Sequence, residues 1–86
     1  MIMYYYYQKN RLDNLIKHRV ERGLTQQDMA DYLGMGRSTY QRKEYGENQF
    51  LLNESIILML FFGEPFMDLF GDLFESFARM EVDKNS

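Results

Sequence analysis

The side chains of this sequence that could do chemistry are mainly arginines, lysines and hydroxyls, because the groups on which most enzymes and metal sites depend are nearly absent. His18 is the only histidine, and there is no cysteine. A transition-metal site needs several nitrogen or sulfur ligands. Catalysis by a nucleophile or general base needs partnered groups, and the sequence shows no paired carboxylates in an evident cleft and no glycine-rich phosphate loop. We therefore expect no enzymatic activity, no metal and no cofactor.

Positive charge is concentrated in the first part of the chain. Residues 1–50 contain eight basic and six acidic side chains, whereas residues 51–86 contain two and seven, which together give the net charge of -3. Such an asymmetry favours a polyanionic partner for the first part alone. The absence of cysteine fits a reducing cytoplasm, which is where we expect the protein to reside.

Four glycines divide the chain into helices. Gly23, Gly34, Gly46 and Gly63 each follow a stretch with helical spacing. Glycine is favoured just past a helix end because it adopts the left-handed conformation without steric cost. Pro65 suits the first turn of a further helix. The pattern predicts helices over about 11–22, 25–33, 37–45 and 52–62, and a fifth from about residue 65.

Caps and apolar spacing support these helices. Asn10 should cap the first helix. The hydroxyl of Thr25 should accept from the amide of Asp28 while Asp28 returns a bond, which makes a capping box. The residues expected to face the core are Leu12, Leu15, Ile16, Val20, Met29, Ala30, Leu33 and Tyr40. The helix at 37–45 should then turn most of its polar side chains outward, namely Arg37, Ser38, Thr39, Gln41 and Arg42.

The expected architecture is a single all-α domain over residues 1–86. Its parts are an N-terminal arm, a four-helix core, a C-terminal packing and dimerisation helix, and a frayed tail, at 1–9, 10–63, 64–80 and 81–86. Four consecutive tyrosines give the arm strand propensity and a large contact area, so a short extended conformation is one interpretation. The arm could pair with that of a second copy, lie over the fifth helix, follow DNA, or be a mobile terminus.

The segment SIILMLFF at 55–62 is too short for a membrane span, which takes roughly 20 apolar residues in a helix. The run stops at Gly63. No basic stretch followed by a small-residue cleavage site appears at the amino terminus, so we expect no signal peptide. The segment should therefore be covered by protein, and we expect no membrane association.

One stretch resembles a known family. Residues 23–47 read GLTQQDMADYLGMGRSTYQRKEYGE, in which two short helices flank a three-residue turn with glycine. The sequence is similar to Cro and the lambda-type phage repressors, the xenobiotic-response-element (XRE) family of bacterial regulators. The resemblance covers roughly residues 11–70 and includes Arg-x-x-x-Gly-Leu-Thr-Gln, Leu-Gly and Glu-x-Gly at the family's spacing. It implies a five-helix, lambda-repressor-like fold with the helix-turn-helix at the second and third helices.

The resemblance also implies roles for individual residues. Arg37 is the best candidate for reading a base, because an arginine can donate twice to guanine. The implied base contacts are Arg37, Ser38, Thr39 and Arg42, and the implied contacts to the DNA backbone are Thr25, Gln26, Lys17, Arg22, Gln41 and Lys43. Arg19 and Glu44 match positions that form a structural ion pair. Gly36 replaces the usual Ser or Thr cap, and Lys43 stands where the family commonly has a large apolar residue.

The helix at 52–62 departs from the family in another way, because Ile57 and Leu60 occupy positions that are usually polar. A helix that is apolar all round must be buried on both sides. We expect the fifth helix to cover part of it and a second copy of the chain to cover the rest. The predicted dimer interface comprises Ile57, Leu60, Phe61, Phe66, Phe70, Phe74 and Phe77.

Two functions fit these observations. The first is a regulator of transcription that binds specific double-stranded DNA, a repressor that occupies an inverted-repeat operator as a homodimer. The second is a protein-interaction module, such as an antitoxin or a regulator from a phage or mobile element, which acts mainly through the apolar surface of the last two helices and binds a second protein there.

Overall fold

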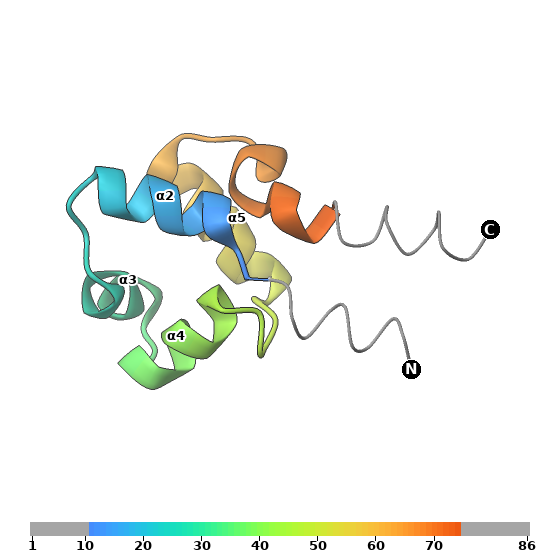
Figure 1. The fold of residues 1–86 in the computed structure, drawn as a ribbon. Coiled ribbons are helices and arrows are strands. Elements are labelled where there is room, and N and C mark those ends of the chain that lie inside the picture. The colour runs from blue at the N-terminus through green and yellow to red at the C-terminus, as the bar shows by residue number, and fades with distance from the viewer. Residues whose placement is uncertain (1–10, 75–86) are drawn as a thin grey trace, which may run out of the picture.

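The computed structural model of the chain describes residues 11–74, and Figure 1 shows their arrangement. The helices are α2 (Asp13–Glu21), α3 (Gln26–Leu33), α4 (Arg37–Glu44) and α5 (Leu52–Phe62). A further helical segment begins at residue 66 and continues through residue 74, the last one described. Residues 11–74 contain no strand, and the expected all-α fold is confirmed. The predicted arm and tail lie outside the described residues, as do Asn10 and Phe77. The predicted Asn10 cap is wrong, because the N-cap of α2 is Leu12.

Local signals set the ends of α3 and α5 where the sequence predicts them. Thr25 Oγ1 accepts from the Asp28 amide at 3.0 Å, and the Asp28 carboxylate accepts from the Thr25 amide at 2.8 Å. Hydrogen bonding of the Asp28 carboxylate to the Thr25 backbone amide, and then to the Thr25 side chain, lowers the pKa of Asp28. Gly34 and Gly63 follow the helices with φ of 72° and 68°, the left-handed region that glycine tolerates best.

Helix α2 begins two residues later than the sequence predicts. The backbone amide of Leu12 donates to the carbonyl of Glu44, at 3.0 Å, so the chain enters the fold as a strap across the end of α4 before the helix starts. Leu12 is the N-cap and makes no side-chain cap. This backbone bond is a long-range contact, which the local pattern could not reveal.

The core draws on every described helix and on the segment 66–74. Its buried members are Leu12, Leu15, Met29, Ala30, Tyr40, Leu58, Phe62, Leu69 and Phe70. Val20 is exposed, contrary to expectation. On a helix, Val20 lies at the edge of the stripe centred on Leu15, and Arg19 takes the inward position there because it pairs with Glu44.

The segment 66–74 docks against the first turn of α2. Gly71 is buried, and a Cβ placed on it would lie 3.4 Å from Asn14 Nδ2. The backbone amide of Asn14 donates to Asp72 Oδ2 at 2.8 Å, which satisfies one of the unpaired amides of that turn. This contact holds the segment on the side of the molecule opposite α3 and α4 (Figure 1). Within residues 11–74, no helix combines the length and apolar character needed to cross a membrane.

Candidate nucleic-acid interface

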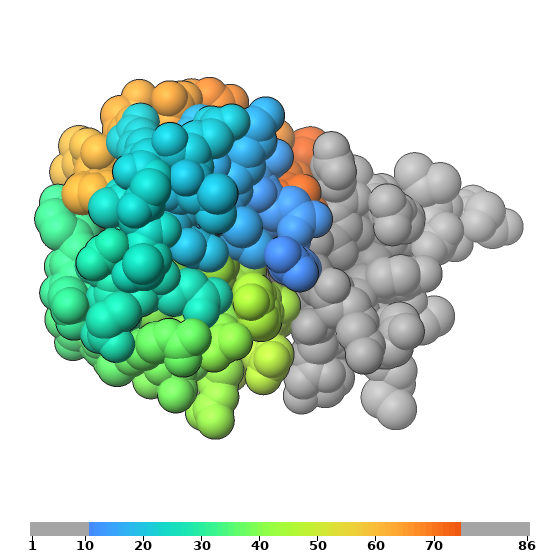
Figure 2. Space-filling view, turned by 60° about the vertical axis from the view of Figure 1, so that its left-hand side comes forward, coloured from blue at the N-terminus to red at the C-terminus, as the bar shows by residue number. Residues whose placement is uncertain are grey.

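Helices α3 and α4 and the turn between them form a compact polar unit. The Met35 amide donates to the Ala30 carbonyl at 2.9 Å, which closes the turn after Gly34. Gly36 is the N-cap of α4, with an extended backbone and no side-chain cap. The space-filling view in Figure 2 shows α2, α3 and α4 together on one face of the molecule. The first turn of α4 therefore lies on a surface that α2 and α3 also form.

The four residues expected to meet DNA bases all point to solvent. Arg37, Ser38, Thr39 and Arg42 are exposed. Among the contacts between residues 11–74, no hydrogen bond or ion pair engages their side chains. Gln41 is half-buried on the same helix. These side chains lie at the start of an α-helix and along its outer face, which is the part of a recognition helix that contacts base edges in the major groove.

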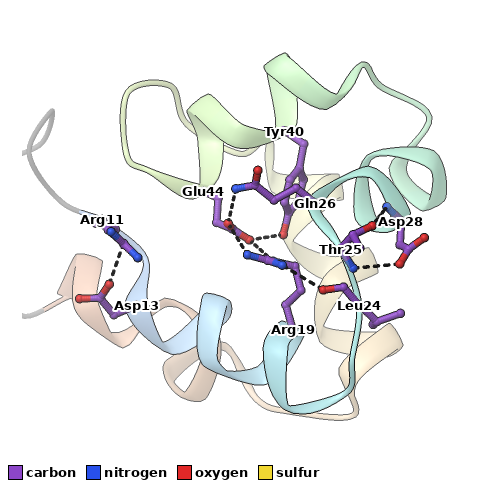
Figure 3. A network of polar contacts seen from close by, with 9 residues as sticks. All are labelled: Arg11, Asp13, Arg19, Leu24, Thr25, Gln26, Asp28, Tyr40 and Glu44. Carbon is purple, nitrogen blue, oxygen red and sulfur yellow. Dashed lines mark hydrogen bonds and ion pairs between the residues drawn. The ribbon is translucent and has the colours of Figure 1, made fainter.

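Glu44 holds α4 in place from within the core. Its side chain is fully buried and accepts four hydrogen bonds (Figure 3). Arg19 donates from Nε to Oε2 at 2.8 Å and from Nη2 to Oε1 at 3.1 Å, which is a two-point contact between guanidinium and carboxylate. The Tyr40 hydroxyl donates to Oε2 at 2.8 Å, and Gln26 Nε2 donates to Oε1 at 3.0 Å. One carboxylate thus joins α2, α3 and α4.

The surroundings of Glu44 shift the pKa values of its partners. Burial, followed by the charge and hydrogen bond of Glu44, raises the pKa of Tyr40 well above its usual value. For Arg19, burial lowers the pKa, but the hydrogen bond and charge of Glu44 outweigh it and the net shift is upward. Arg19 Nη1 also donates to the Leu24 carbonyl at 2.9 Å. The network therefore contains a charged carboxylate and guanidinium beside a neutral phenol, and each side chain has a defined partner.

The N-terminus of α3 offers less to a phosphate than the sequence suggests. The Thr25 hydroxyl accepts from the Asp28 amide, and Gln26 gives a side-chain donor to Glu44. The ionised Asp28 carboxylate sits at the same helix end and accepts from the Thr25 amide. An anion approaching these amides would meet that negative charge. Gln26 Nε2 keeps a second hydrogen, and a phosphate contact by Thr25 or Gln26 stays a prediction.

Lys43 is turned inward, which corrects its expected role at a phosphate. Its Nζ lies 2.7 Å from Glu54 Oε1 and 5.9 Å from the centre of the Phe50 ring. Lys43 follows Tyr40 by three residues, so both project from the inner side of α4. The lysine stem occupies the place where the family commonly has an apolar residue, and its ammonium group finds a carboxylate at the start of α5. Glu54 stands three residues after Leu51 at the start of α5, which is the position of a capping-box carboxylate. That position was the sequence signal for a carboxylate partner of Lys43.

Arg22 is also engaged within the chain, which corrects its expected phosphate contact. Its Nη2 donates to the Phe62 carbonyl at 2.7 Å, and its guanidinium lies 4.9 Å from the centre of the Phe62 ring. The last carbonyls of α5 have no partner within the helix and carry partial negative charge, so a cation is stabilised there. Lys17 is exposed, and no hydrogen bond among the described residues engages its side chain.

A second exposed surface lies on α5 and is apolar. Leu52, Ile56, Ile57 and Leu60 project from one side of the helix, and we call these four residues the apolar face. Leu52 and Leu60, about two turns apart on the helix, are 78% and 77% exposed. Ile57 and Leu60 were predicted to be at an interface from the sequence. Leu52 and Ile56 were not, although the i, i+4, i+8 spacing from 52 to 60 could have revealed them.

The aromatic residues expected at a dimer interface divide into two groups. Phe66 and Phe74 are exposed, as is Met67, which the sequence analysis did not name. Phe70 is buried in the chain's own core, 6.0 Å from the Phe50 ring between centres, which corrects its assignment to an interface. Phe61 is half-buried, with its ring centre 4.4 Å from that of Tyr32.

The comparison with known proteins agrees with this geometry. No group of three histidine, cysteine, aspartate or glutamate residues able to hold a metal occurs in the described part of the chain. A family model described as helix-turn-helix matches residues 15–69. No curated protein and no solved structure gives a significant match. The matched range contains the α3–turn–α4 unit and the buried network that holds it, and the chain thus belongs to the XRE-type helix-turn-helix family of DNA-binding transcription regulators, the family of Cro and the lambda-type repressors.

Proposed function

We propose that the protein is a repressor that recognises a specific double-stranded DNA sequence with the first turn of α4. The observation that carries this proposal is the contrast between the two sides of α4. Its inner side is fixed by Glu44 and Tyr40, whereas Arg37, Ser38 and Thr39 are exposed without partners among residues 11–74. Sequence-specific binding benefits from a rigid helix beneath the exposed readout groups, because a mobile helix would lose additional conformational entropy on binding.

The exposed residues divide into base and backbone roles. Arg37 would donate twice to a guanine edge, with Ser38, Thr39 and Arg42 beside it in the groove. Lys17, Thr25, Gln26 and Gln41 would contact phosphates and fix the register without reading sequence. Lys43 and Arg22 have no part in this contact set, because their charged groups are engaged at the two ends of α5.

The proposed functional unit is a homodimer formed through the apolar face of α5. Exposed contiguous apolar side chains on a soluble domain mark an interaction surface. A two-fold axis through such a surface would place two α4 helices about one DNA turn apart, roughly 34 Å, and would require an inverted-repeat operator. Binding DNA in this way would place the protein in the cytoplasm, with the chromosome.

Selection from a random duplex pool tests sequence recognition and symmetry together. We expect the purified protein to enrich an inverted repeat. Recovery of a sequence-independent pool would contradict the proposal, and recovery of single half-sites would contradict the dimer.

Replacing Arg37 tests the assigned readout directly. Arg37→Ala should weaken binding to the selected duplex by about 1–3 kcal/mol and relax the preference at one position of each half-site. Fluorescence anisotropy with the selected and mismatched duplexes measures both effects. The control is Arg11→Ala, which removes an exposed arginine that pairs with Asp13 and lies 5.2 Å from the ring centre of Tyr45, at the opposite end of α4 from Arg37. Equal losses for the two variants would show a general charge effect rather than base readout.

A protein-interaction module is the second candidate, and the exposure of Leu52 and Leu60 is the observation that favours it. In that case the apolar face would prefer a different chain over a second copy. Sedimentation of the pure protein separates the two, because an interaction module would remain monomeric at tens of micromolar. Its DNA affinity would also lack the steep fall with salt that accompanies phosphate neutralisation.

A further inference from the structure

We infer that Lys43 and Glu54 form a positioning pair that sets the orientation of α4 relative to α5, and thereby the spacing between the two operator half-sites that the dimer accepts. The part concerning half-sites rests on the proposed function. The pair acts through geometry and touches no DNA. Lys43 belongs to the last turn of α4 and Glu54 to the first turn of α5.

The contacts of the pair connect the two helices at one point. Lys43 Nζ and Glu54 Oε1 are 2.7 Å apart, and the two side chains are only 12% and 14% exposed. The same carboxylate oxygen accepts from the Leu51 backbone amide at 2.9 Å. Glu54 therefore does two things with one atom. It fixes the first turn of α5, and it fixes that turn to α4.

Apolar packing leaves this junction partly unfilled. A hollow of about 300 Å³ lies beside the pair, between the loop after α4 and the segment 66–74, and Lys43, Phe50, Ser55 and Phe66 are among the residues that line it. The Phe50 ring is the nearest aromatic support, with its centre 5.8 Å from that of Tyr40. Among the described residues, the Lys43–Glu54 contact is the one side-chain hydrogen bond between α4 and α5. Where close packing does not fix two helices, a directional bond has more influence on their angle.

The two helices carry the two surfaces of the proposed function. Arg37 lies at the far end of α4 from Lys43, and the apolar face extends along α5 from Leu52, two residues before Glu54, to Leu60. A small rotation at the junction therefore moves the first turn of α4 relative to the dimer axis. In a two-fold dimer both copies rotate, so the change in separation between the readout groups is doubled.

The ion pair between Lys43 and Glu54 also affects the stability of the fold. Burying charges costs desolvation, so replacing such a pair by apolar side chains of similar size is often neutral or stabilising. Lys43→Met retains the length of the stem and removes the charge. Because the variant leaves the largely buried Glu54 carboxylate without its opposite charge, we expect it to unfold at a lower temperature than the unmodified protein, while the angle between α4 and α5 becomes less defined. A purely structural role would predict no change in that angle distribution and no change in DNA spacing.

Two variants and a matched control test the inference on DNA. Lys43→Met and Glu54→Gln each break the ion pair, and Glu54→Gln keeps an acceptor for the Leu51 amide. The control is Arg11→Met, which breaks the Arg11–Asp13 pair, whose side chains are 58% and 69% exposed. Duplexes with the selected half-sites and spacers one base pair shorter or longer are compared by anisotropy. The unmodified protein and the control should prefer one spacer several-fold, and both variants should lose most of that preference. Retention of the full preference would overturn the inference.

A second measurement does not depend on DNA. The sequence contains no cysteine, so Ser38→Cys on α4 and Asn53→Cys on α5 introduce the two sites for spin labels, diluted with unlabelled protein to isolate distances within one chain. The Lys43→Met distance distribution should be broader than that of the parent, and an unchanged distribution would overturn the positioning role. If the unmodified protein enriches no DNA sequence, the proposed function fails, and the label distances still decide whether the pair sets the angle.

Discussion

The surfaces of α4 and α5 differ in what they expose and in what holds them. The first turn of α4 exposes Arg37, Ser38 and Thr39 and is anchored by a fully buried glutamate with four donors. Helix α5 exposes four aliphatic residues and is anchored by Leu58 and Phe62 in the core. The helix that carries the polar groups proposed to read DNA is thus held by directional hydrogen bonds. The helix that carries the apolar face is held by burial of apolar side chains, which is not directional. Directional support suits a surface that must place hydrogen-bond donors accurately, and burial suits one that needs only shape.

The largest effect should come from breaking the polar anchor. Arg19→Met removes the guanidinium from Glu44 and leaves a buried carboxylate without its opposite charge, so the free energy of unfolding should fall by about 3–5 kcal/mol. Urea unfolding followed by circular dichroism measures the loss. Arg11→Met, at an exposed ion pair, should cost below about 1 kcal/mol. A small effect at Arg19 would mean that Tyr40 and Gln26 alone satisfy Glu44.

Charging the apolar face should act on association rather than on folding. Leu60→Glu places a carboxylate on one of the two most exposed leucines of α5, so we expect self-association to weaken by about 2 kcal/mol, the scale of a central interface residue. The unfolding midpoint should stay close to that of the parent. Sedimentation equilibrium measures the first quantity and thermal unfolding the second. Val20→Glu is the matched control, because Val20 is an exposed aliphatic residue on α2. If the two variants self-associated equally strongly, the apolar face would not be part of the interface.

The polar anchor should also give the domain a sensitivity to high pH. Because folding raises the pKa of Tyr40, its contribution to stability is complete below the unfolded value of about 10 and is lost as the pH rises above it. The slope from this one group is about 1.4 kcal/mol per pH unit. Unfolding by urea between pH 9 and pH 11 measures it, and Tyr40→Phe should remove this component. Tyr32→Phe, at an exposed site on α3 without a bond to Glu44, should retain it.

The sequence predicted the elements better than the side-chain partners. Helix α3 and helix α5 have the predicted bounds because Thr25, Gly34 and Gly63 act locally, through caps that a few adjacent residues determine. Arg19 and Glu44 are paired as the resemblance implied.

The contacts of the Lys43 and Arg22 side chains could not be predicted from adjacent residues in the same way. Each is a flexible cation near a helix end, and what decides its position is a carboxylate or carbonyl brought close by the packing of α5. Phe70 illustrates the same limit for apolar residues, because the sequence gives its helix face but not whether that face meets the chain's own core or a partner. Periodicity identifies a stripe, and only the tertiary arrangement identifies what covers it.

Gly36 leaves the start of α4 without a cap of its own. It supplies no side-chain oxygen to the amides of the first turn, and apart from its chain neighbours no atom lies within 4 Å of where a Cβ would lie. A serine introduced there would fit, would accept from an amide of that turn and would raise the melting temperature. The order of this helix therefore depends on the buried contacts of Tyr40 and Glu44 further along it.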